Sequence, residues 1–241
     1  MAAERVQKLI AAAGLGSRRR AEEWMRQGRV RVNGEVAGLG DRADPHHDRI
    51  ELDGRPLAER PPQQVLLLNK PIGVLCSCHD PQGRPTVLDL LPPAWRRGSG
   101  LHPVGRLDAD SRGALLLSND GDLTLRLTHP RYGHRKTYRV RVAGCPSPAT
   151  LERWAAGVPL EGQPSAPVGV RLLRRDRQGA LLELVMGEGR NRQIRRTGAL
   201  LGHPVLDLQR IAIGSVPLGD LPEGSWRELE PQEWEALVAP A

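Results

Sequence analysis

One carboxylate lies among arginines in residues 105–113, which read Gly-Arg-Leu-Asp-Ala-Asp-Ser-Arg-Gly. Farther along the chain, residues 189–196 read Gly-Arg-Asn-Arg-Gln-Ile-Arg-Arg. An ionised Asp108 has the chemistry of a nucleophile or a base, and clustered guanidinium groups suit the oxygens of an anionic backbone. The two segments together predict chemistry on nucleic acid.

The composition agrees with an anionic partner. The chain has 241 residues and a net charge of +7, and its pI is about 10.1, which favours a polyanion. Only Lys8, Lys70 and Lys136 are lysines among the 35 basic residues, and arginine offers forked donors that match phosphate oxygens. Codon bias also produces an arginine-rich chain without phenylalanine, so charge alone does not decide the function.

The remaining composition excludes other classes. The longest apolar runs are too short for a membrane span, so no membrane partner is expected. Three cysteines and no secretory signal indicate a reduced, cytoplasmic location. The fragment Cys-Ser-Cys-His at 76–79 lacks a second pair at ligand spacing, so no metal site is expected.

The order of elements predicts a small N-terminal domain at residues 4–57. Apolar residues at helical spacing, an N-cap at Ser17 and the turn at Asn33-Gly34 predict two helices followed by short strands. Between Arg5 and Arg31 there are eight basic residues and two glutamates. The arginines expected to bind substrate in this domain are Arg18, Arg19, Arg20 and Arg26.

The rest of the chain predicts a second, larger domain and an α+β fold overall. Residues 58–64 have the composition of a linker, residues 65–230 form the mixed domain, and residues 231–241 are a C-terminal tail. Strands are expected at 65–68, 114–117, 138–142 and 180–185 and around Ile211 and Ile213, with a helix at 193–201 and an N-cap at Asp122.

Asp110 follows Asp108 by two residues, which leaves two interpretations open. A carboxylate pair would serve as general acid and base or bind a divalent metal, as in a nuclease. Alternatively, Asp110 and Ser111 cap the turn, which is the interpretation we favour. Arg84 lies in a separate turn-rich loop at 80–87 and is a candidate for phosphate contact.

Several ordered motifs resemble known families. The helix-loop-helix followed by Arg-Val-x-Val-Asn-Gly resembles the S4 RNA-binding domain. Gly-Arg-Leu-Asp, then Asn-Asp-Gly, Lys-Thr-Tyr-x-Val and Glu-Gly-Arg-Asn-Arg-Gln-Ile-Arg-Arg resemble the pseudouridine synthases of ribosomal RNA, most closely the large-subunit synthase B group. The resemblance covers roughly residues 4–230.

The resemblance implies a role for each matching residue. Asp108 matches the essential aspartate, Tyr138 the tyrosine that stacks on the target base, and Arg195 the basic residue paired with the aspartate. Arg106 matches the arginine that fills the gap left by a flipped base, and Leu184 an apolar wall. The resemblance also implies a mixed, mostly antiparallel sheet with flanking helices and an RNA cleft. The further residues expected to bind substrate or shape its site are Lys70, Arg190 and Arg192.

The implied reaction is the isomerisation of uridine to pseudouridine in large-subunit ribosomal RNA. It has no redox change and needs no energy input, and the chain has no P-loop, so no cofactor is expected. The expected partner of a monomeric enzyme is ribosomal RNA, free or within an assembling large subunit. The alternative is a non-catalytic S4-type RNA-binding or ribosome-assembly factor.

Overall fold

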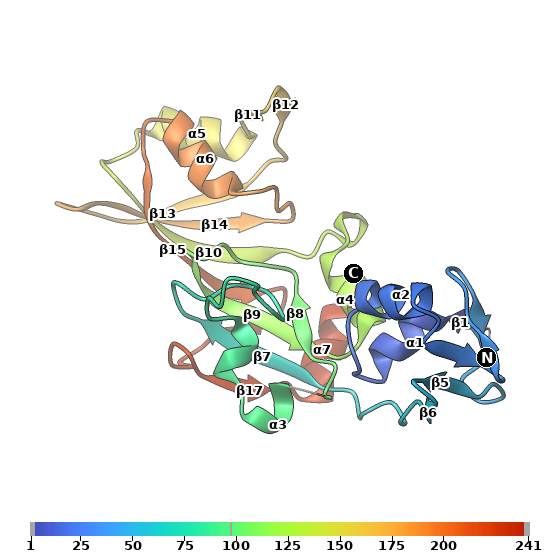
Figure 1. Ribbon diagram of the computed structural model, residues 1–241. Helices are drawn as coiled ribbons and strands as arrows, with labels where there is room; N and C mark the ends of the chain where they lie inside the picture. Colours follow the sequence, from blue (N-terminus) through green and yellow to red (C-terminus); the bar gives the residue numbers. More distant parts are fainter. Residues whose placement is uncertain (1–2, 97, 239–241) are drawn as a thin grey trace. The chain divides into compact units, whose positions relative to one another are not determined.

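The computed structural model describes residues 3–96 and 98–238, and contacts between Cα atoms divide the chain into two compact units (Figure 1). The first unit is built on the N-terminal segment up to Gln64 and also contains Leu91–His102 and Ser118–Gly121. The second unit contains the remaining segments. No helix among the described residues has the length and apolar character needed to cross a membrane.

The two predicted helices of the first unit are present. They are α1 (Val6–Ala12) and α2 (Arg18–Arg26), and the Ser17 hydroxyl accepts a hydrogen bond from the Arg20 amide at 3.2 Å, as expected of an N-cap. Val6 and Ile10 of α1 pack against Ala21 and Met25 of α2 in one buried cluster. These residues at helical spacing therefore form the apolar face that the sequence predicts.

Short strands complete the first unit. One sheet has the order β3 (Glu35–Val36), β2 (Val30–Val32), β5 (Ile50–Leu52), β6 (Arg55–Pro56), and β1 (Glu4–Arg5) pairs with β4 (Arg42–Ala43). Asn33-Gly34 and Asp53-Gly54 close the two hairpins with positive φ at both residues. Successive positive φ angles match the twist of a two-residue hairpin, which confirms the predicted turn at Asn33.

The second unit is built on a mixed, mostly antiparallel sheet, which confirms the predicted α+β class. In the described chain this sheet has nine strands, with the path β13-β14-β10-β15-β9-β7-β17, while β16 pairs with β15 and β8 with β9. The β15–β9 pairing is parallel, whereas β13–β14, β14–β10, β10–β15, β15–β16 and β17–β7 pair antiparallel. The strands are β7 (Val65–Lys70), β8 (His102–Val104), β9 (Arg112–Ser118), β10 (Lys136–Val142), β13 (Gly169–Asp176), β14 (Gly179–Met186), β15 (Val205–Ile213), β16 (Val216–Pro217) and β17 (Trp226–Glu228).

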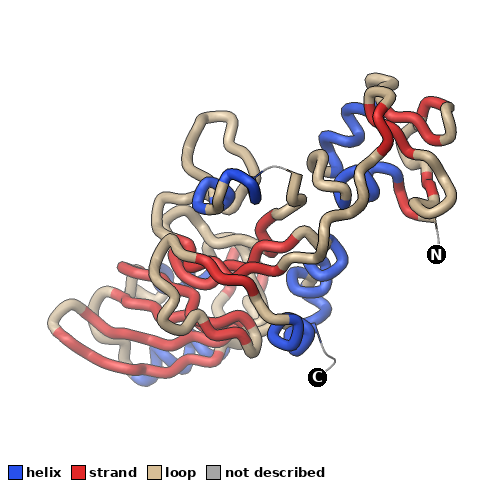
Figure 2. Tube along the Cα trace, turned by 90° about the horizontal axis from the view of Figure 1, so that it is seen from below, coloured by secondary structure: helices blue, strands red, loops and turns tan. Residues whose placement is uncertain are grey.

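Helices and short elements connect these strands along the chain, and Figure 2 colours the helices blue and the strands red. The α-helices are α3 (Pro93–Arg96), α4 (Gly121–Thr128), α5 (Pro148–Ala156), α6 (Gln193–Leu200) and α7 (Pro231–Val238). The short elements are two 3-10 turns (Val87–Leu90 and Pro130–Tyr132) and the two-residue strands β11 (Pro159–Leu160) and β12 (Gln163–Pro164).

Two apolar clusters hold the helices on the sheet. Trp154 of α5 and Ile194 of α6 are buried with Val140 and Leu182 of β10 and β14, and Figure 1 shows these two helices lying together over that part of the sheet. A second cluster joins the β7 and β9 part of the sheet to α4 and α7. At about 25 cal/mol per Å² of apolar surface, such clusters supply most of the stabilisation of a fold.

Several details differ from the sequence-based expectation. Helix α4 begins at Gly121, so Asp122 lies in its first turn and is not the N-cap, although its charge there still complements the helix dipole. Residues 231–238 of the expected tail form α7, whose Leu237 is buried. The edge strand β13 was missed because its residues are mostly exposed and lack a clear apolar alternation.

Arg227 and Glu233 join the edge strand β17 to α7. The two side chains form a bidentate pair at 2.8 and 2.7 Å, and the Glu230 amide also donates to Glu233 at 3.0 Å. These hydrogen bonds, first that from Arg227, lower the pKa of Glu233 from 4.5 to about 2. A lowered pKa means that the charged form stabilises the folded state.

We therefore predict a pH-dependent cost of Glu233→Gln. The wild type should be more stable than the variant above about pH 5, and the difference should shrink as the pH falls from 4.5 towards 2, where Glu233 takes up its proton. Urea unfolding at several pH values measures this difference. Glu235→Gln is the control, because Glu235 is exposed on the same helix. A stability difference that stays constant down to pH 2 would contradict the assignment.

Candidate active site

The turn that carries Asp108 is fixed to the middle of the sheet. It lies between β8 and β9, and the Ser111 amide donates to the Asp108 carbonyl at 3.1 Å. Directly after it, β9 runs parallel to β15, with Gly113 opposite Arg210. Gly113 has φ +107°, and a Cβ atom there would overlap with the backbone of Arg210. Glycine is therefore required for the close approach that sets the position of this turn.

A buried lysine supports the turn from β7. Lys70 has no exposed surface, and its Nζ donates to the carbonyls of Pro71 at 2.8 Å and Ser111 at 2.7 Å. The Gly73 amide donates to the Ala109 carbonyl at 2.7 Å. Burial lowers the pKa of Lys70, while nearby groups, including Asp110 and Asp108, oppose that shift. Two donors of Lys70 thus serve the protein backbone and support the turn, and the binding of substrate by Lys70 stays a prediction.

The residues 108–110 meet the start of α6 through arginine side chains. Arg192 forms a bidentate pair with Asp110, at 3.1 and 2.8 Å, and its Nη1 lies 3.8 Å from Asp108 Oδ2. Arg195 Nε lies 3.3 Å from Asp110 Oδ2, and its Nη2 donates to the Asp110 carbonyl at 2.6 Å and to Ser111 Oγ at 3.3 Å. The hydrogen bonds from Arg192 lower the pKa of Asp110, with a further contribution from the charge of Arg195.

This geometry corrects the expected ion pair. The resemblance implied that Arg195 faces Asp108, but the cation within 4 Å of that carboxylate, among the described residues, is Arg192. Arg195 instead binds the two residues that follow in the turn. The spacing of arginines in the segment 189–196 gives no signal for this exchange, because it depends on how the first turn of α6 is placed.

Tyr138 lies on β10 beside the same elements. It is opposite Leu184 of β14 and Arg210 of β15, and only 7% of its surface is exposed. Its ring belongs to one apolar cluster with Leu184, with Leu107, which precedes Asp108, and with Ile194 of α6. The structure thus brings the segments that carry Asp108, Tyr138 and Arg195 together, and Leu184 packs with them as a fully buried residue.

The other predicted arginines fall into two groups. Arg106 is exposed and forms no ion pair with the residues described, so its guanidinium is available to a ligand. Arg84 forms a bidentate pair with Asp80, which lowers the pKa of Asp80 to about 2. Arg190 pairs with Glu188 and donates to the carbonyl of Pro164. Arg84 therefore holds its own loop, and Arg190 joins its segment to β12.

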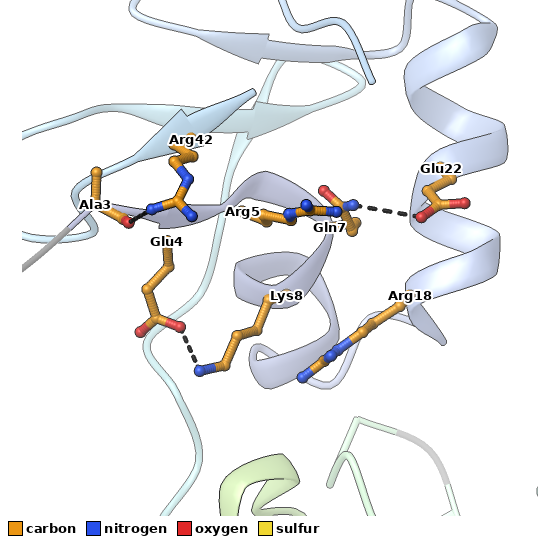
Figure 3. A pocket seen from close by; sticks show the side chains of 8 residues that line it. All are labelled: Ala3, Glu4, Arg5, Gln7, Lys8, Arg18, Glu22 and Arg42. Carbon is orange, nitrogen blue, oxygen red and sulfur yellow. Dashed lines mark hydrogen bonds and ion pairs between the residues drawn. The ribbon is translucent and has the colours of Figure 1, made fainter. Parts of the chain in front are cut away.

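The N-terminal unit contains a basic hollow of about 360 Å³ (Figure 3). The side chains around it come from α1, α2 and the β1–β4 pair. Lys8 pairs there with Glu4 at 2.6 Å, whereas Arg5 and Arg18 form no ion pair with any described residue. Sequence reasoning missed Arg42, because the two-residue strands that bring it there have no periodic signal. The cations of this hollow are Arg5, Lys8, Arg18 and Arg42.

The remaining arginines predicted to bind substrate, Arg19, Arg20 and Arg26, are exposed on α2. Arg20 pairs with Glu23 at 2.7 Å and also lies over the ring of Trp24. Arg26 lies 3.8 Å from Glu22. This helix therefore presents arginines to solvent while its acidic residues partly compensate them.

Among the described residues, no group of three or more His, Cys, Asp and Glu side chains has the arrangement needed to hold an ion. Asp108 and Asp110 share an arginine instead.

Comparison with known proteins identifies the family to which the chain belongs. Residues 64–199 match the model of the RNA pseudouridylate synthase family, and residues 4–50 match the S4 domain. The chain belongs to the RNA pseudouridylate synthase family and carries an S4 domain at its N-terminus.

The matching relatives cover nearly the whole chain. "Ribosomal large subunit pseudouridine synthase B" of Bacillus subtilis is 41% identical over 239 residues, which are 98% of this chain and 96% of the relative. An "Uncharacterized RNA pseudouridine synthase" of Aquifex aeolicus is 40% identical and covers 95% of this chain and 91% of its own. A solved structure described as a pseudouridylate synthase has a TM-score of 0.71 and 33% identity, and the match covers 97% of this chain and 99% of that one.

We predict that Lys70→Met destabilises the second unit. Methionine fills a similar volume but leaves the buried carbonyl of Ser111 without its donor, which costs about 1–3 kcal/mol. Urea unfolding followed by tryptophan fluorescence measures the loss. Unfolding at the wild-type urea concentration would show that the buried hydrogen bonds contribute no net stability.

Proposed function

We propose that this protein isomerises specific uridines to pseudouridine in large-subunit ribosomal RNA, with Asp108 as the reacting carboxylate. The observation that carries the proposal is the match to a relative of that name across both the S4 domain and the synthase domain. The substrate is ribosomal RNA, free or in an assembling large subunit, and the enzyme works as a cytoplasmic monomer.

The reaction exchanges one bond for another. The bond between N1 of uracil and C1′ of the ribose breaks, C5 bonds to C1′, C5 loses its proton, and N1 gains one. No oxidant, reductant or nucleotide is consumed. Asp108 takes part by attack on C1′, by attack on C6, or by proton removal, and all three routes need its ionised form. Arg192 Nη1 lies 3.8 Å from Asp108 Oδ2 and places a positive charge beside the carboxylate.

The target base must leave its stack before Asp108 reaches it. Arg106 is exposed two residues before Asp108, so its planar guanidinium is available to fill the vacated space in the RNA. Tyr138 and Leu184 lie side by side on neighbouring strands and form the apolar wall for the flipped base. Arg195 supports this site by holding the turn at Asp110 and Ser111.

The N-terminal unit anchors the RNA through phosphate contacts. The basic hollow carries Arg5 and Arg18, which have no ion-pair partner among the described residues. Guanidinium groups in this state lose no internal pair when they bind phosphate.

We predict that Asp108→Asn abolishes turnover and leaves the fold intact. The change is nearly isosteric but deletes the charge and the nucleophile, so the rate should fall more than roughly a thousandfold, or about 4 kcal/mol of barrier. Release of tritium from 5-tritiated uridine in ribosomal RNA measures the reaction. Asp176→Asn is the matched control, because Asp176 also pairs with arginines but lies on the edge strand β13. A rate within tenfold of the wild type would remove Asp108 from the reaction.

The same assay separates the alternative function. A wild-type protein that binds ribosomal RNA but releases no tritium would be a non-catalytic RNA-binding or assembly factor. Mapping of pseudouridines in ribosomal RNA from cells that lack the gene identifies the modified position.

We also predict that Arg5→Gln with Arg18→Gln weakens RNA binding in a salt-dependent way. Each phosphate contact contributes about −0.7 to the slope of log K against log salt for single-stranded RNA, so losing two should flatten it by roughly 1.4. Binding is measured by filter retention between low and high salt. Arg49→Gln is the control, because Arg49 lies in the same unit and pairs with Glu51 at 2.7 Å. An unchanged slope would show that the hollow does not bind phosphate.

A further inference from the structure

The carboxylate of Asp110 is bound more firmly than that of Asp108. Both oxygens of Asp110 accept hydrogen bonds from Arg192, at 3.1 and 2.8 Å, and Arg195 Nε lies 3.3 Å from one of them. Asp108 has one cation within 4 Å among the described residues, Arg192 at 3.8 Å. Asp108, the residue expected to react, is thus paired more loosely, whereas Asp110 accepts both hydrogen bonds of the Arg192 guanidinium.

We propose that Asp110 is a positioning residue, which holds Arg192 beside Asp108 without letting it bind the reacting oxygens. This inference rests on the proposed function, since it gives Asp110 and Arg192 a task in the same site. Asp110 acts through Arg192 and touches neither the substrate nor the reacting atoms.

The physical reason lies in what a nucleophile or base requires. A bidentate arginine donates a hydrogen bond to each oxygen of a carboxylate, which ties up electron density on both oxygens and makes each a weaker nucleophile or base. A guanidinium nitrogen at 3.8 Å attracts the negative carboxylate through its charge but forms no hydrogen bond at that distance. Asp110 supplies the acceptor for the fork, so Arg192 provides charge to Asp108 and leaves its oxygens available.

The backbone shows that the position of Arg192 is imposed. Arg192 precedes α6 with φ +48° and ψ +30°, a left-handed conformation that residues with a Cβ atom rarely adopt. Its side chain makes no capping hydrogen bond to the helix. The bidentate pair with Asp110 therefore holds the far end of a side chain whose backbone is in an unfavourable conformation.

Asp110 is itself a fixed point. Its carbonyl accepts from Arg195 Nη2 at 2.6 Å, and the carbonyls on either side accept from Gly73 and Lys70. The carboxylate is 46% exposed and the turn beneath it is tied at three successive residues. Replacement of this side chain should thus release Arg192 without unfolding the turn.

The test compares four proteins on an RNA fragment that contains the target uridine. They are the wild type, Asp110→Asn, Arg192→Gln and the double variant. Single-turnover rates at saturating enzyme report chemistry, and RNA dissociation constants are measured separately. We expect Asp110→Asn to slow the single-turnover rate by about tenfold or more. It should bind RNA at least as tightly as the wild type, because one negative charge is removed from the site.

The double variant gives the readout that a purely structural role would not. If Asp110 acts through Arg192, the double variant should be no more than about threefold slower than Arg192→Gln alone. Multiplying rate losses, or a wild-type rate for Asp110→Asn, would overturn the inference. Asp176→Asn serves again as the control that changes an arginine-paired carboxylate elsewhere.

Arg192→Lys is the second variant, because it keeps the charge and loses the fork on an exposed side chain whose replacement does not threaten the core. It should show a slowing like that of Asp110→Asn, and a wild-type rate would equally overturn the inference. A wild-type protein without pseudouridine formation would instead reject the proposed function. An active wild type with inactive Asp108→Asn and fully active Asp110→Asn would reject only the role of Asp110.

Discussion

The buried ammonium of Lys70 is the interaction on which the site depends. A charge without water around it is costly unless hydrogen bonds replace that water. Lys70 obtains them from the carbonyls of Pro71 and Ser111, which join the end of β7 to the turn before β9. Strand β17 fixes β7 from its other side. The sheet therefore holds the turn with Asp108 rigidly, and this turn does not have the mobility of a surface loop.

Around this turn, charge and apolar packing have separate tasks. Apolar contacts place α6 against β10 and β14, so that Tyr138 and Ile194 belong to one cluster with Leu107. This packing places the arginines at the start of α6 beside the acidic turn. Because the charged groups remain partly exposed, their ion pairs add modest stability. The ion pairs orient the charged side chains, whereas the apolar core supplies the stabilisation that keeps the site assembled.

Much of the fold follows from local signals in the sequence. The Ser17 cap and the turn at Asn33-Gly34 are determined locally, because the interactions that form them involve residues only a few positions apart. Long apolar runs such as residues 114–117 also identify buried strands. The edge strand β13 gave no such signal, because a strand with mostly exposed side chains resembles a loop.

The sequence predicted which residues belong to the candidate site, but it did not predict which of them form ion pairs with one another. Motif order identified Asp108, Tyr138 and the arginines of the segment 189–196. Which arginine meets which aspartate depends on side-chain geometry at a helix start, where Arg192 takes a left-handed conformation. The burial of Lys70 was equally invisible, because a lysine next to a proline turn usually lies in solvent.

The rarity of lysine acquires a meaning from its placement. In a chain that uses arginine for nearly every cation, Lys70 and Lys136 are both cations whose burial lowers their pKa, and Lys136 also donates to a backbone carbonyl, that of His134. An ammonium is small and directs three donors around one nitrogen, whereas a guanidinium is a broad plane. Replacement of a lysine by an arginine thus meets a steric limit at Lys70, which has no exposed surface, but not at Lys8 beside the open hollow. In relatives of this chain, a lysine retained at the position of Lys70 would mark a cation enclosed by the fold.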